Sequence, residues 1–298
     1  VDISFIDNKN RGGARYRAAL GLLMGVERTR QMMKIGFIGT GNMGGALASA
    51  AARSGEVEVL LANRTKAKAE TLAERIGAVV SSNEIIAREA DHIFLGVKPQ
   101  MIVDVLKGIA PALKERKSAP VLISMVTGPD IARIQELAGG DYPVIRIMPN
   151  TPAAVGAGTI LYAAQNVTDA QLNAFRAVLA QAGLLLPLPE AQIDAASAIS
   201  GCGPAFCFQF ADALALGGVR AGLSYPDACR LAAQTMLGAA EMLLQGGEAP
   251  DVLKMRVCSP AGTTIEGVLA LEQGGFSYTV QNAVTAAYRR TVEMTKKG

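Results

Sequence analysis

Histidine is nearly absent from this 298-residue chain, which holds His92 and no other. One histidine excludes a histidine-rich metal cluster and makes a Ser-His-Asp triad hard to build. Four cysteines, Cys202, Cys207, Cys229 and Cys258, show no CxxC spacing, so we expect neither a metal site nor a redox pair. A lone histidine without placed partners is typical of a structural role, and we interpret His92 in that way.

Long apolar runs and a charge excess in the body of the chain are also missing. No apolar run reaches about 18 uninterrupted residues, so we expect no membrane span. Residues 1–32 carry six basic and three acidic residues, which leaves 23 of each from totals of 29 and 26. A neutral body argues against a nucleic-acid partner. Unpaired cysteines favour a reducing compartment, and we expect a cytoplasmic protein.

The composition nevertheless supports a large core, because 50% of the residues are hydrophobic and 18% are charged. Such a chain is not disordered. Residues 1–32 are weakly patterned, and their apolar stretch lacks the small-residue cleavage site of a signal peptide. We interpret 1–32 as a leader or an added extension and expect the folded chain to begin near Met33.

Strands and helices alternate over residues 33–190. The hydrophobic pattern predicts short buried strands over 34–39, 57–62, 78–80, 92–97, 121–126 and 144–148, with helices between them. This alternation implies right-handed crossovers and a mostly parallel sheet with helices on both faces. We therefore predict an α/β chain whose N-terminal domain, 33–190, is a Rossmann-like dinucleotide-binding domain.

The period changes after residue 190. Helices are predicted over 191–198, 204–222, 225–245, 250–257, 264–272 and 276–296, with no strand pattern. These helices are rich in Ala, Leu and Met and poor in charge, so they need cover on several sides. We predict an all-helical domain, 191–298, that is buried against a second copy of the chain in a homodimer or larger assembly.

A glycine-rich run follows the first predicted strand and opens a helix. Gly39-Thr-Gly41-Asn-Met-Gly44 has the GxGxxG spacing of a dinucleotide-binding turn. Gly39 would allow the tight turn, Gly41 the close approach of a pyrophosphate, and Gly44 the packing of helix on strand. The helix N-terminus would bind the phosphates. The alternative is an ordinary strand-to-helix turn.

The end of the second predicted strand indicates which cofactor binds. An NAD site usually has an acidic residue there, whereas this chain has Asn63-Arg64-Thr65-Lys66. The Arg64 guanidinium suits a 2′-phosphate, so we predict NADPH in preference to NADH. The alternative is that Arg64 and Lys66 belong to an ordinary solvated face.

Together these motifs resemble the pyrroline-5-carboxylate reductase family. The resemblance covers nearly all of 33–298, and the blocks after the glycine loop are Val97-Lys-Pro99, Arg146-Ile-Met-Pro-Asn-Thr-Pro152, Ser200-Gly-Cys-Gly-Pro-Ala205 and Ser259-Pro-Ala-Gly-Thr-Thr-Ile265. It implies NADPH-dependent reduction of 1-pyrroline-5-carboxylate to L-proline, the last step of proline biosynthesis, by hydride transfer to the imine carbon. It also implies an interlocked dimer, with the active site between the nucleotide domain and the dimer helices, and leaves a decamer open.

The resemblance also implies which residues form the site. The cofactor would contact Gly39, Gly41, Asn42, Met43, Gly44, Asn63, Arg64, Thr65, Asn83, Val97, Lys98, Pro99, Ser124, Met125 and Val126. The substrate would contact Ser259, Gly262, Thr263 and Thr264, with Thr264 as the catalytic hydroxyl near the ring nitrogen. Backbone N–H groups of Gly262, Thr263 and Thr264 at a helix start would suit the substrate carboxylate.

Several alternatives stay open at this point. Ser259 or Thr263 could merely cap the helix. The family often has Gly where Ala261 stands, and a small polar residue in some members where Arg256 stands. We expect Arg146 to tether the loop over 148–152, and Asn150 to bond its own backbone there.

Two rival functions also fit parts of the pattern. A hydroxyacid dehydrogenase would need a lysine near the nicotinamide, but the helical region has only Lys254 before residue 290. A non-catalytic NADP-binding sensor would keep Gly39–Gly44 and Arg64, yet it has no need for the Ser259–Thr264 block.

Overall fold

The computed structural model describes residues 32–55 and 57–295, and Met33–Gly298 forms one unit. The expected leader, 1–32, lies outside the described residues except for Met32.

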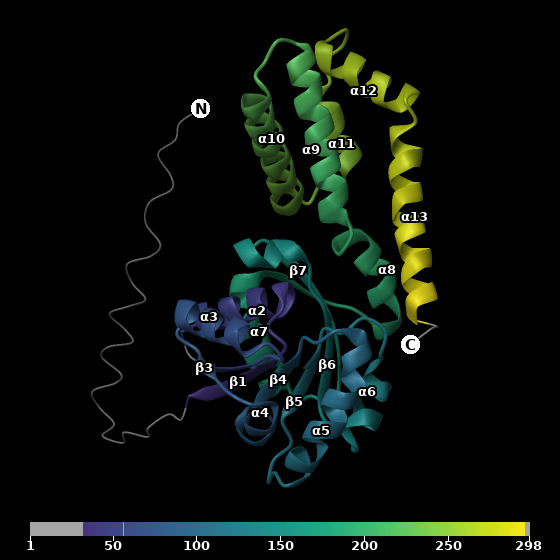
Figure 1. Ribbon diagram of the computed structural model, residues 1–298. Coiled ribbons are helices and arrows are strands. Elements are labelled where there is room, and N and C mark those ends of the chain that lie inside the picture. The colour runs from purple at the N-terminus through teal and green to yellow at the C-terminus, as the bar shows by residue number, and fades with distance from the viewer. Residues whose placement is uncertain (1–31, 56, 296–298) are drawn as a thin grey trace, which may run out of the picture. The chain divides into compact units, whose positions relative to one another are not determined.

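An eight-stranded sheet occupies the first half of the described chain (Figure 1). Its order is β3-β2-β1-β4-β5-β6-β7-β8, and every described pair of neighbours is parallel except β6 with β7. The first six strands follow the 3-2-1-4-5-6 order of doubly wound dinucleotide-binding folds. The strands are β1 (Met33–Ile38), β2 (Val57–Ala62), β3 (Val79–Val80), β4 (His92–Leu95), β5 (Val121–Ser124), β6 (Val144–Met148), β7 (Gly158–Gln165) and β8 (Gly183–Pro187).

Helices cover both faces of this sheet. They are α2 (Asn42–Arg53), α3 (Lys66–Ile76), α4 (Asn83–Glu89), α5 (Ile102–Lys114), α6 (Ile131–Ala138) and α7 (Asp169–Leu179). Short 3₁₀ helices span Pro99–Met101, Thr151–Val155 and Ala180–Ala182. Gly77 ends α3 with φ 70°, the left-handed conformation that glycine adopts without steric cost. These elements confirm the predicted mostly parallel α/β architecture.

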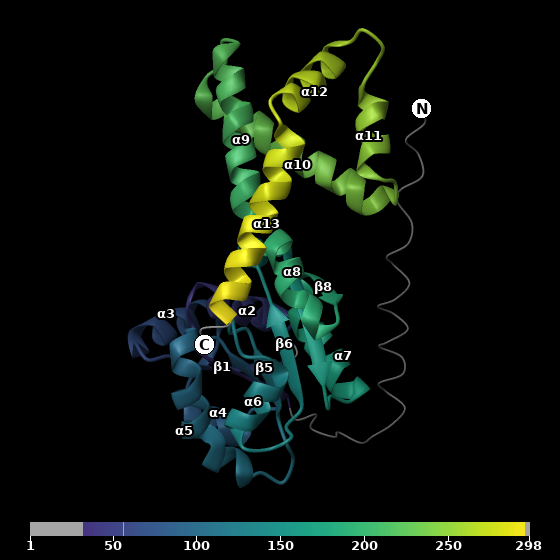
Figure 2. The same cartoon turned by 90° about the vertical axis from the view of Figure 1, so that its right-hand side faces the viewer.

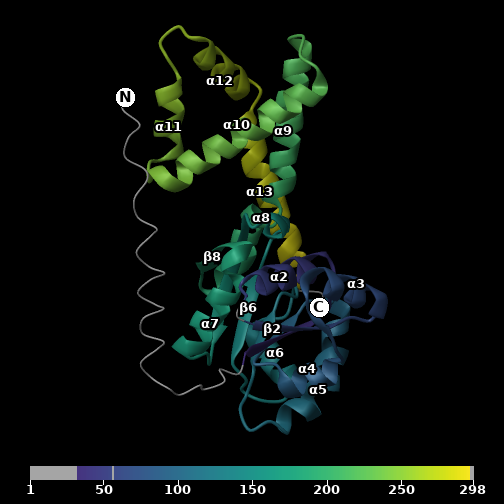
Figure 3. The same ribbon diagram turned by 90° about the vertical axis from the view of Figure 1, so that its left-hand side faces the viewer.

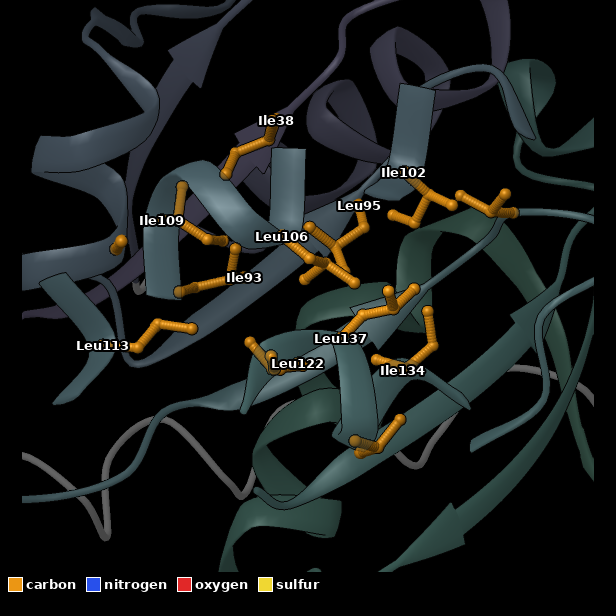
Figure 4. Packing of buried hydrophobic residues seen from close by; sticks show 14 of the residues in the cluster. Ile38, Ile93, Leu95, Ile102, Leu106, Ile109, Leu113, Leu122, Ile134 and Leu137 are labelled. Carbon is orange, nitrogen blue, oxygen red and sulfur yellow. The ribbon is translucent and has the colours of Figure 1, made fainter. Parts of the chain in front are cut away.

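Alternate residues of each strand enter two different cores, because successive side chains point to opposite faces. Ile38, Ile93, Leu95 and Leu122 pack with α4, α5 and α6 on one face (Figure 4). On the other face, Ile35, Phe37, Leu61, Phe94 and Ile123 pack with α2, α3 and α7. Burial on both faces explains why the strands read as continuous apolar runs.

The sequence pattern missed β7, α7 and β8. The β7 strand pairs antiparallel with β6, and β8 returns parallel to β7. The start of α7 has a local signal, because Thr168 and Gln171 form a reciprocal capping box there. The predicted mostly parallel sheet is therefore correct in kind but too small by two strands.

From Glu190 onward the described chain is helical. The helices are α8 (Glu190–Ser200), α9 (Gly203–Arg220), α10 (Tyr225–Gly246), α11 (Pro250–Val257), α12 (Thr263–Gln273) and α13 (Phe276–Thr295). Their bounds agree with the predicted helices to within about two residues, the usual spread of helix ends. Figures 2 and 3 show these helices as an open set, with α9, α10 and α12 away from the sheet and α13 returning beside α8.

The helical region has little core of its own. Its fully buried apolar residues within the described chain are Ile193, Ala198, Ala215, Ala228 and Ala232. Large side chains are exposed instead, including Phe208 and Tyr278 at 71% and Leu244 at 79%. An apolar surface of this extent marks an interaction site.

One helical stretch of the described residues, Glu190–Arg220, is long and apolar enough to cross a membrane by length and composition alone. The stretch is two helices, α8 and α9, separated at Gly201 and Cys202. Asp194 of α8 is paired with Arg146. The helix α8 packs on the sheet, whereas α9 lies in the open helical region. The two helices therefore do not form one continuous span, and length and composition alone are weak evidence that this stretch crosses a membrane.

Candidate active site

The carboxyl ends of β1 and β4 form the first part of the site. The strand order reverses between these two strands, and ligands of doubly wound sheets bind in the crevice outside such a point. Gly39 follows β1 with φ 100°, which suits glycine. A Cβ on Gly44 would collide with the carbonyl oxygen of Gly39. The absence of a side chain at position 44 therefore lets α2 pack directly on the turn.

The first turn of α2 presents backbone to the open side of this crevice. Gly41 is the N-cap, and no side chain caps it. A Cβ at Gly41 would meet nothing within 4 Å, so the space beside it is open. Asn42 is exposed and Met43 is half-buried. Unsatisfied N–H groups at a helix start, together with open space, are the features that bind a pyrophosphate.

Asn63, Arg64 and Thr65 follow β2 and adjoin this turn. The Asn63 amide accepts from the Thr40 backbone N–H at 3.2 Å and donates to the Thr65 carbonyl at 3.0 Å. Asn63 therefore ties the glycine turn to the end of β2, and its amide already has two protein partners. Arg64 is exposed, and no hydrogen bond or ion pair within the described residues engages it. Its guanidinium is available to a ligand.

Two polar residues near Arg64, Lys66 and Asn83, are placed differently from it. Lys66 pairs with Glu70 at 3.2 Å, and both side chains are largely exposed. Asn83 is the first residue of α4, directly after β3, and is exposed at the same edge of the sheet. Thus Asn83 adjoins the strand end that carries Arg64, since β3 pairs with β2.

The turns after β4 and β5 form the other side of the crevice. Val97 is half-buried, whereas Lys98 and Pro99 are exposed at the start of a 3₁₀ helix. The Ser124 side chain is fully buried, and its hydroxyl accepts from the Val126 N–H at 3.3 Å. The buried Ser124 hydroxyl therefore stabilises the turn after β5. Of the three predicted cofactor contacts Ser124, Met125 and Val126, Met125 is the most exposed.

The Ser259–Thr264 block forms the start of α12. Gly262 is the N-cap, with no side-chain cap, so the alternative that Ser259 or Thr263 caps this helix is wrong. The Gly262 N–H donates to the Ser259 carbonyl at 3.0 Å and is not free for a ligand, contrary to our expectation. Thr263 and Thr264 are exposed at the first turn.

Ala261 gives this block its shape, with φ 57°, in the left-handed region that favours glycine. No hydrogen bond or ring contact within the described chain joins Ser259–Thr264 to the sheet, and all three views place α12 away from the sheet (Figures 1, 2 and 3). One protomer therefore does not bring the block to its own glycine turn.

Arg256 has a clear partner in the described chain. Its guanidinium forms two hydrogen bonds with the Glu248 carboxylate, at 2.5 and 2.6 Å. This bidentate pair joins the last turn of α11 to the segment after α10. Arg256 thus has a structural contact just before the substrate block.

The structure corrects the expected contacts of Arg146 and Asn150. Arg146 does not tether the loop over 148–152, because its Nη2 donates to Asp194 at 2.7 Å. Asn150 does not bond its own backbone through its side chain; it donates to the Ser200 carbonyl and accepts from the Thr159 N–H, both at 2.8 Å. Both residues reach α8 because β6 lies beside it in three dimensions.

His92 is structural, as the sequence indicated. It is 3% exposed, and its Nε2 lies 3.2 Å from the Gln171 carbonyl oxygen. Burial lowers the pKa of His92 below its usual value of 6.5. Among the described residues no cluster of three or more His, Cys, Asp or Glu could hold a metal ion. The described site therefore offers backbone donors, hydroxyls and cations.

The strand order, the glycine turn and an arginine in place of the usual acid define an NADP-linked oxidoreductase. A family model described as NADP oxidoreductase coenzyme F420-dependent matches residues 34–128. A second model, for pyrroline-5-carboxylate reductase dimerisation, matches residues 190–294. The two matches fall on the sheet region and on the helical region.

Relatives and solved structures agree with this division. Pyrroline-5-carboxylate reductase of Glycine max is 40% identical over 87% of this chain and 95% of its own length. The Corynebacterium melassecola enzyme is 37% identical over 89% and 100%. The Plasmodium falciparum structure, with NADP bound, is 34% identical with a TM-score of 0.78 over 88% of this chain and 98% of that one. The Coxiella burnetii structure is 32% identical, with a TM-score of 0.82 over 89% and 99%.

The chain belongs to the pyrroline-5-carboxylate reductase family. The predicted family, the α/β and helical fold, the NADP-linked reductase class and a dimerisation region are thereby confirmed.

Proposed function

We propose that this chain reduces 1-pyrroline-5-carboxylate to L-proline with NADPH, and that each active site is built from two protomers. The observation that carries this proposal is the exposed, uncapped start of α12 in a chain that also carries an open glycine turn and an Arg64 with no partner among the described residues. A sensor that only binds NADP has no use for the α12 turn. The membership in a reductase family supports the same reaction.

The glycine turn fits a pyrophosphate, because Gly41 leaves open space beside the first turn of α2. In the proposed arrangement Arg64 pairs with the 2′-phosphate, and Thr65 and Asn83 lie beside the adenosine half. Asn63 positions the turn through Thr40. The nicotinamide half of the cofactor lies against Val97, Lys98, Pro99, Met125 and Val126. The Ser124 hydroxyl stabilises the turn after β5 that carries Met125 and Val126.

The substrate end requires few groups. The N–H groups of Thr263 and Thr264, at the positive end of the α12 dipole, bind the substrate carboxylate. Ser259 holds the turn through its carbonyl. The Thr264 hydroxyl hydrogen-bonds the ring nitrogen and keeps the imine oriented. Bound NADPH supplies the hydride to the imine carbon, so the protein contributes mainly orientation and electrostatics.

The two halves of this site meet only across a dimer. No hydrogen bond among the described residues joins the Ser259–Thr264 block to the sheet of its own chain, and the helices around it expose large apolar side chains. We infer that a homodimer covers these side chains and brings the block of one protomer to the nicotinamide of the other. The nucleotide domain is 33–190 and the dimerisation and substrate domain is 191–298. Assembly into a decamer and a cytoplasmic location remain predictions.

The reaction is tested by mixing pure protein with 1-pyrroline-5-carboxylate and NADPH, with NADH in parallel. We expect rapid NADPH oxidation with one proline formed per NADPH consumed. Tight NADPH binding without oxidation would refute the reductase and favour the sensor. The ratio of the NADPH and NADH rates measures the cofactor preference directly.

Heterodimers test whether the site is shared. One protomer carries Gly41→Asp, which repels the pyrophosphate, and the other carries Thr264→Ala; two affinity tags isolate the mixed dimer. A shared site leaves one of the two sites intact, so we expect about half of the wild-type activity. A site within one protomer would leave no intact site, and the mixed dimer would be as inactive as either parent.

A further inference from the structure

The helix α8 connects the sheet region to the dimerisation helices, and two buried side chains hold it at both ends. Arg146 of β6 is 4% exposed; its Nη2 donates to Asp194 at 2.7 Å, and its Nη1 lies 3.6 Å from Glu190. Asn150 is 7% exposed and donates to the Ser200 carbonyl at 2.8 Å. One strand and its following turn thus fix both the first and the last turns of α8.

The same network reaches the turn after β5. The Glu190 carboxylate accepts from the Ile131 N–H, the first of α6, at 2.8 Å. Arg146 also lies opposite Ser124 in the β5–β6 register. The residues between Ser124 and Ile131 include Met125 and Val126, which are proposed to face the nicotinamide. A shift of α8 would therefore be felt at this turn.

The Arg146 network contributes little to the free energy of folding. Arg146 is buried, whereas the side chains of Asp194 and Glu190 are 22% and 29% exposed. Removing the guanidinium from water costs free energy that its attraction to the two carboxylates offsets only in part. The Arg146 Nε is buried and has no hydrogen-bond partner among the described residues, which adds to this cost in free energy. Such an interaction adds little stability, but it restricts α8 to one position relative to β6. A planar guanidinium can donate to its carboxylates in only a few orientations.

The rest of the dimerisation region depends on this geometry. The helix α13 packs along α8 (Figures 1 and 2), and Phe210 of α9 contacts Phe276 of α13 at a ring distance of 5.6 Å. A rotation of α8 is therefore carried to α9 and α13, whose exposed apolar side chains we assign to the dimer.

We propose that Arg146 and Asn150 are positioning residues that set the angle of α8, and thereby the placement of the nicotinamide of one protomer against the substrate block of its partner. The inference rests on the proposed two-protomer site. A misplacement of about 1 Å can reduce hydride transfer 100-fold while leaving binding intact. Cofactor binding should persist in these variants, because the glycine turn follows β1 and Arg64 follows β2, which are three and four strands away from β6 in the sheet.

The test uses Arg146→Met, Asp194→Asn and Asn150→Ala in the full-length dimer. We expect kcat per folded dimer to fall at least 10-fold, with the NADPH dissociation constant changed less than 2-fold. With NADPH deuterated at the transferred position, the isotope effect on kcat should rise, because hydride transfer becomes rate-limiting. Arg88→Ala, which removes two exposed ion pairs, with Glu84 and Glu115, is the matched control and should change neither quantity.

A merely structural role gives a different result. The variants would then unfold at lower temperature, but kcat per folded dimer and the isotope effect would match the wild type, and the proposal would be refuted. Asp194→Asn keeps the shape of the site and serves if Arg146→Met does not fold. Hydrogen exchange provides a readout that does not depend on activity: we expect faster exchange at Ile131 and along α8. Unchanged exchange there would also refute the proposal, whereas an inactive wild type would instead refute the proposed reaction.

Discussion

Arg64→Ala is the most direct test of cofactor selection. Arg64 is exposed, and no partner within the described residues engages it, so the substitution removes a cation without leaving a buried charge unpaired. Neither the glycine turn nor Asn63 depends on it, because the Asn63 amide contacts Thr40 and Thr65. We therefore expect a folded, stable protein with altered NADPH binding.

The size of the effect follows from the chemistry of the contact. A hydrogen bond to a charged group contributes about 1.5–3 kcal/mol, and a guanidinium meets a phosphate through two of its donors. At 1.4 kcal/mol per tenfold, the KM for NADPH should rise about 10- to 150-fold. The KM for NADH should change by less than about 2-fold, because NADH has no 2′-phosphate.

The assay measures initial rates with both cofactors at low and high salt. Lys107→Ala removes an exposed cation from α5, which packs on the sheet face opposite α2 and α3, and serves as the control. Higher salt should narrow the difference between wild type and variant, since the contact is at the surface. Equal rises in both KM values, or the same NADPH effect from Lys107→Ala, would refute a specific role for Arg64.

Three further predictions address the substrate, the fold and pH. Thr264→Ala should lower kcat about 10- to 100-fold with NADPH binding retained, whereas Thr264→Ser should keep most of the wild-type kcat. An unchanged kcat of Thr264→Ala, measured at saturating substrate, would show that the Thr264 hydroxyl takes no part in the reaction. Gly44→Ala should destabilise the fold by about 1–3 kcal/mol in urea unfolding, because its Cβ collides with the Gly39 carbonyl, whereas Gly45→Ala should not, since its Cβ makes only ordinary contact with Leu72. The lowered pKa of His92 means that the unfolded chain takes up a proton first as pH falls through 6.5, so stability should decline below that pH. In His92→Gln this part of the decline should vanish, and an unchanged pH profile would contradict it.

Local signals explain why much of the fold was predictable. A glycine such as Gly77 marks the end of a helix, and the spacing of apolar residues distinguishes helices from strands. Both signals lie within a few neighbouring residues, so a single sequence contains them. The β8 strand was missed because it is largely exposed and has no buried face to pattern it. In β7, the buried apolar run Ile160–Ala163 is a local signal that could have identified the strand. The register of β7 depends on β6, which no local window reveals.

The candidate site divides in the same way. The spacing of Gly39, Gly41 and Gly44 and the lack of an acid after β2 predict a dinucleotide site, because the chemistry is carried by neighbouring residues. The partners of Arg146 and Asn150 were mispredicted, since Asp194 and Ser200 lie about 50 residues further along the chain. Glu190 and Asp194 are spaced for one helix face, which is a signal that could have identified them as a pair.

The sequence by itself determined the dinucleotide-binding turn, the cofactor preference it implies, the change from alternating to helical structure and the family. These properties depend on residue type and short spacing. The tertiary structure alone decided that the Asn63 amide is already occupied, that the Gly262 N–H is used within its own turn, and that the substrate block lies away from the glycine turn of its own chain. Those outcomes depend on how the backbone bends at particular residues and on which distant segments the strand order brings together.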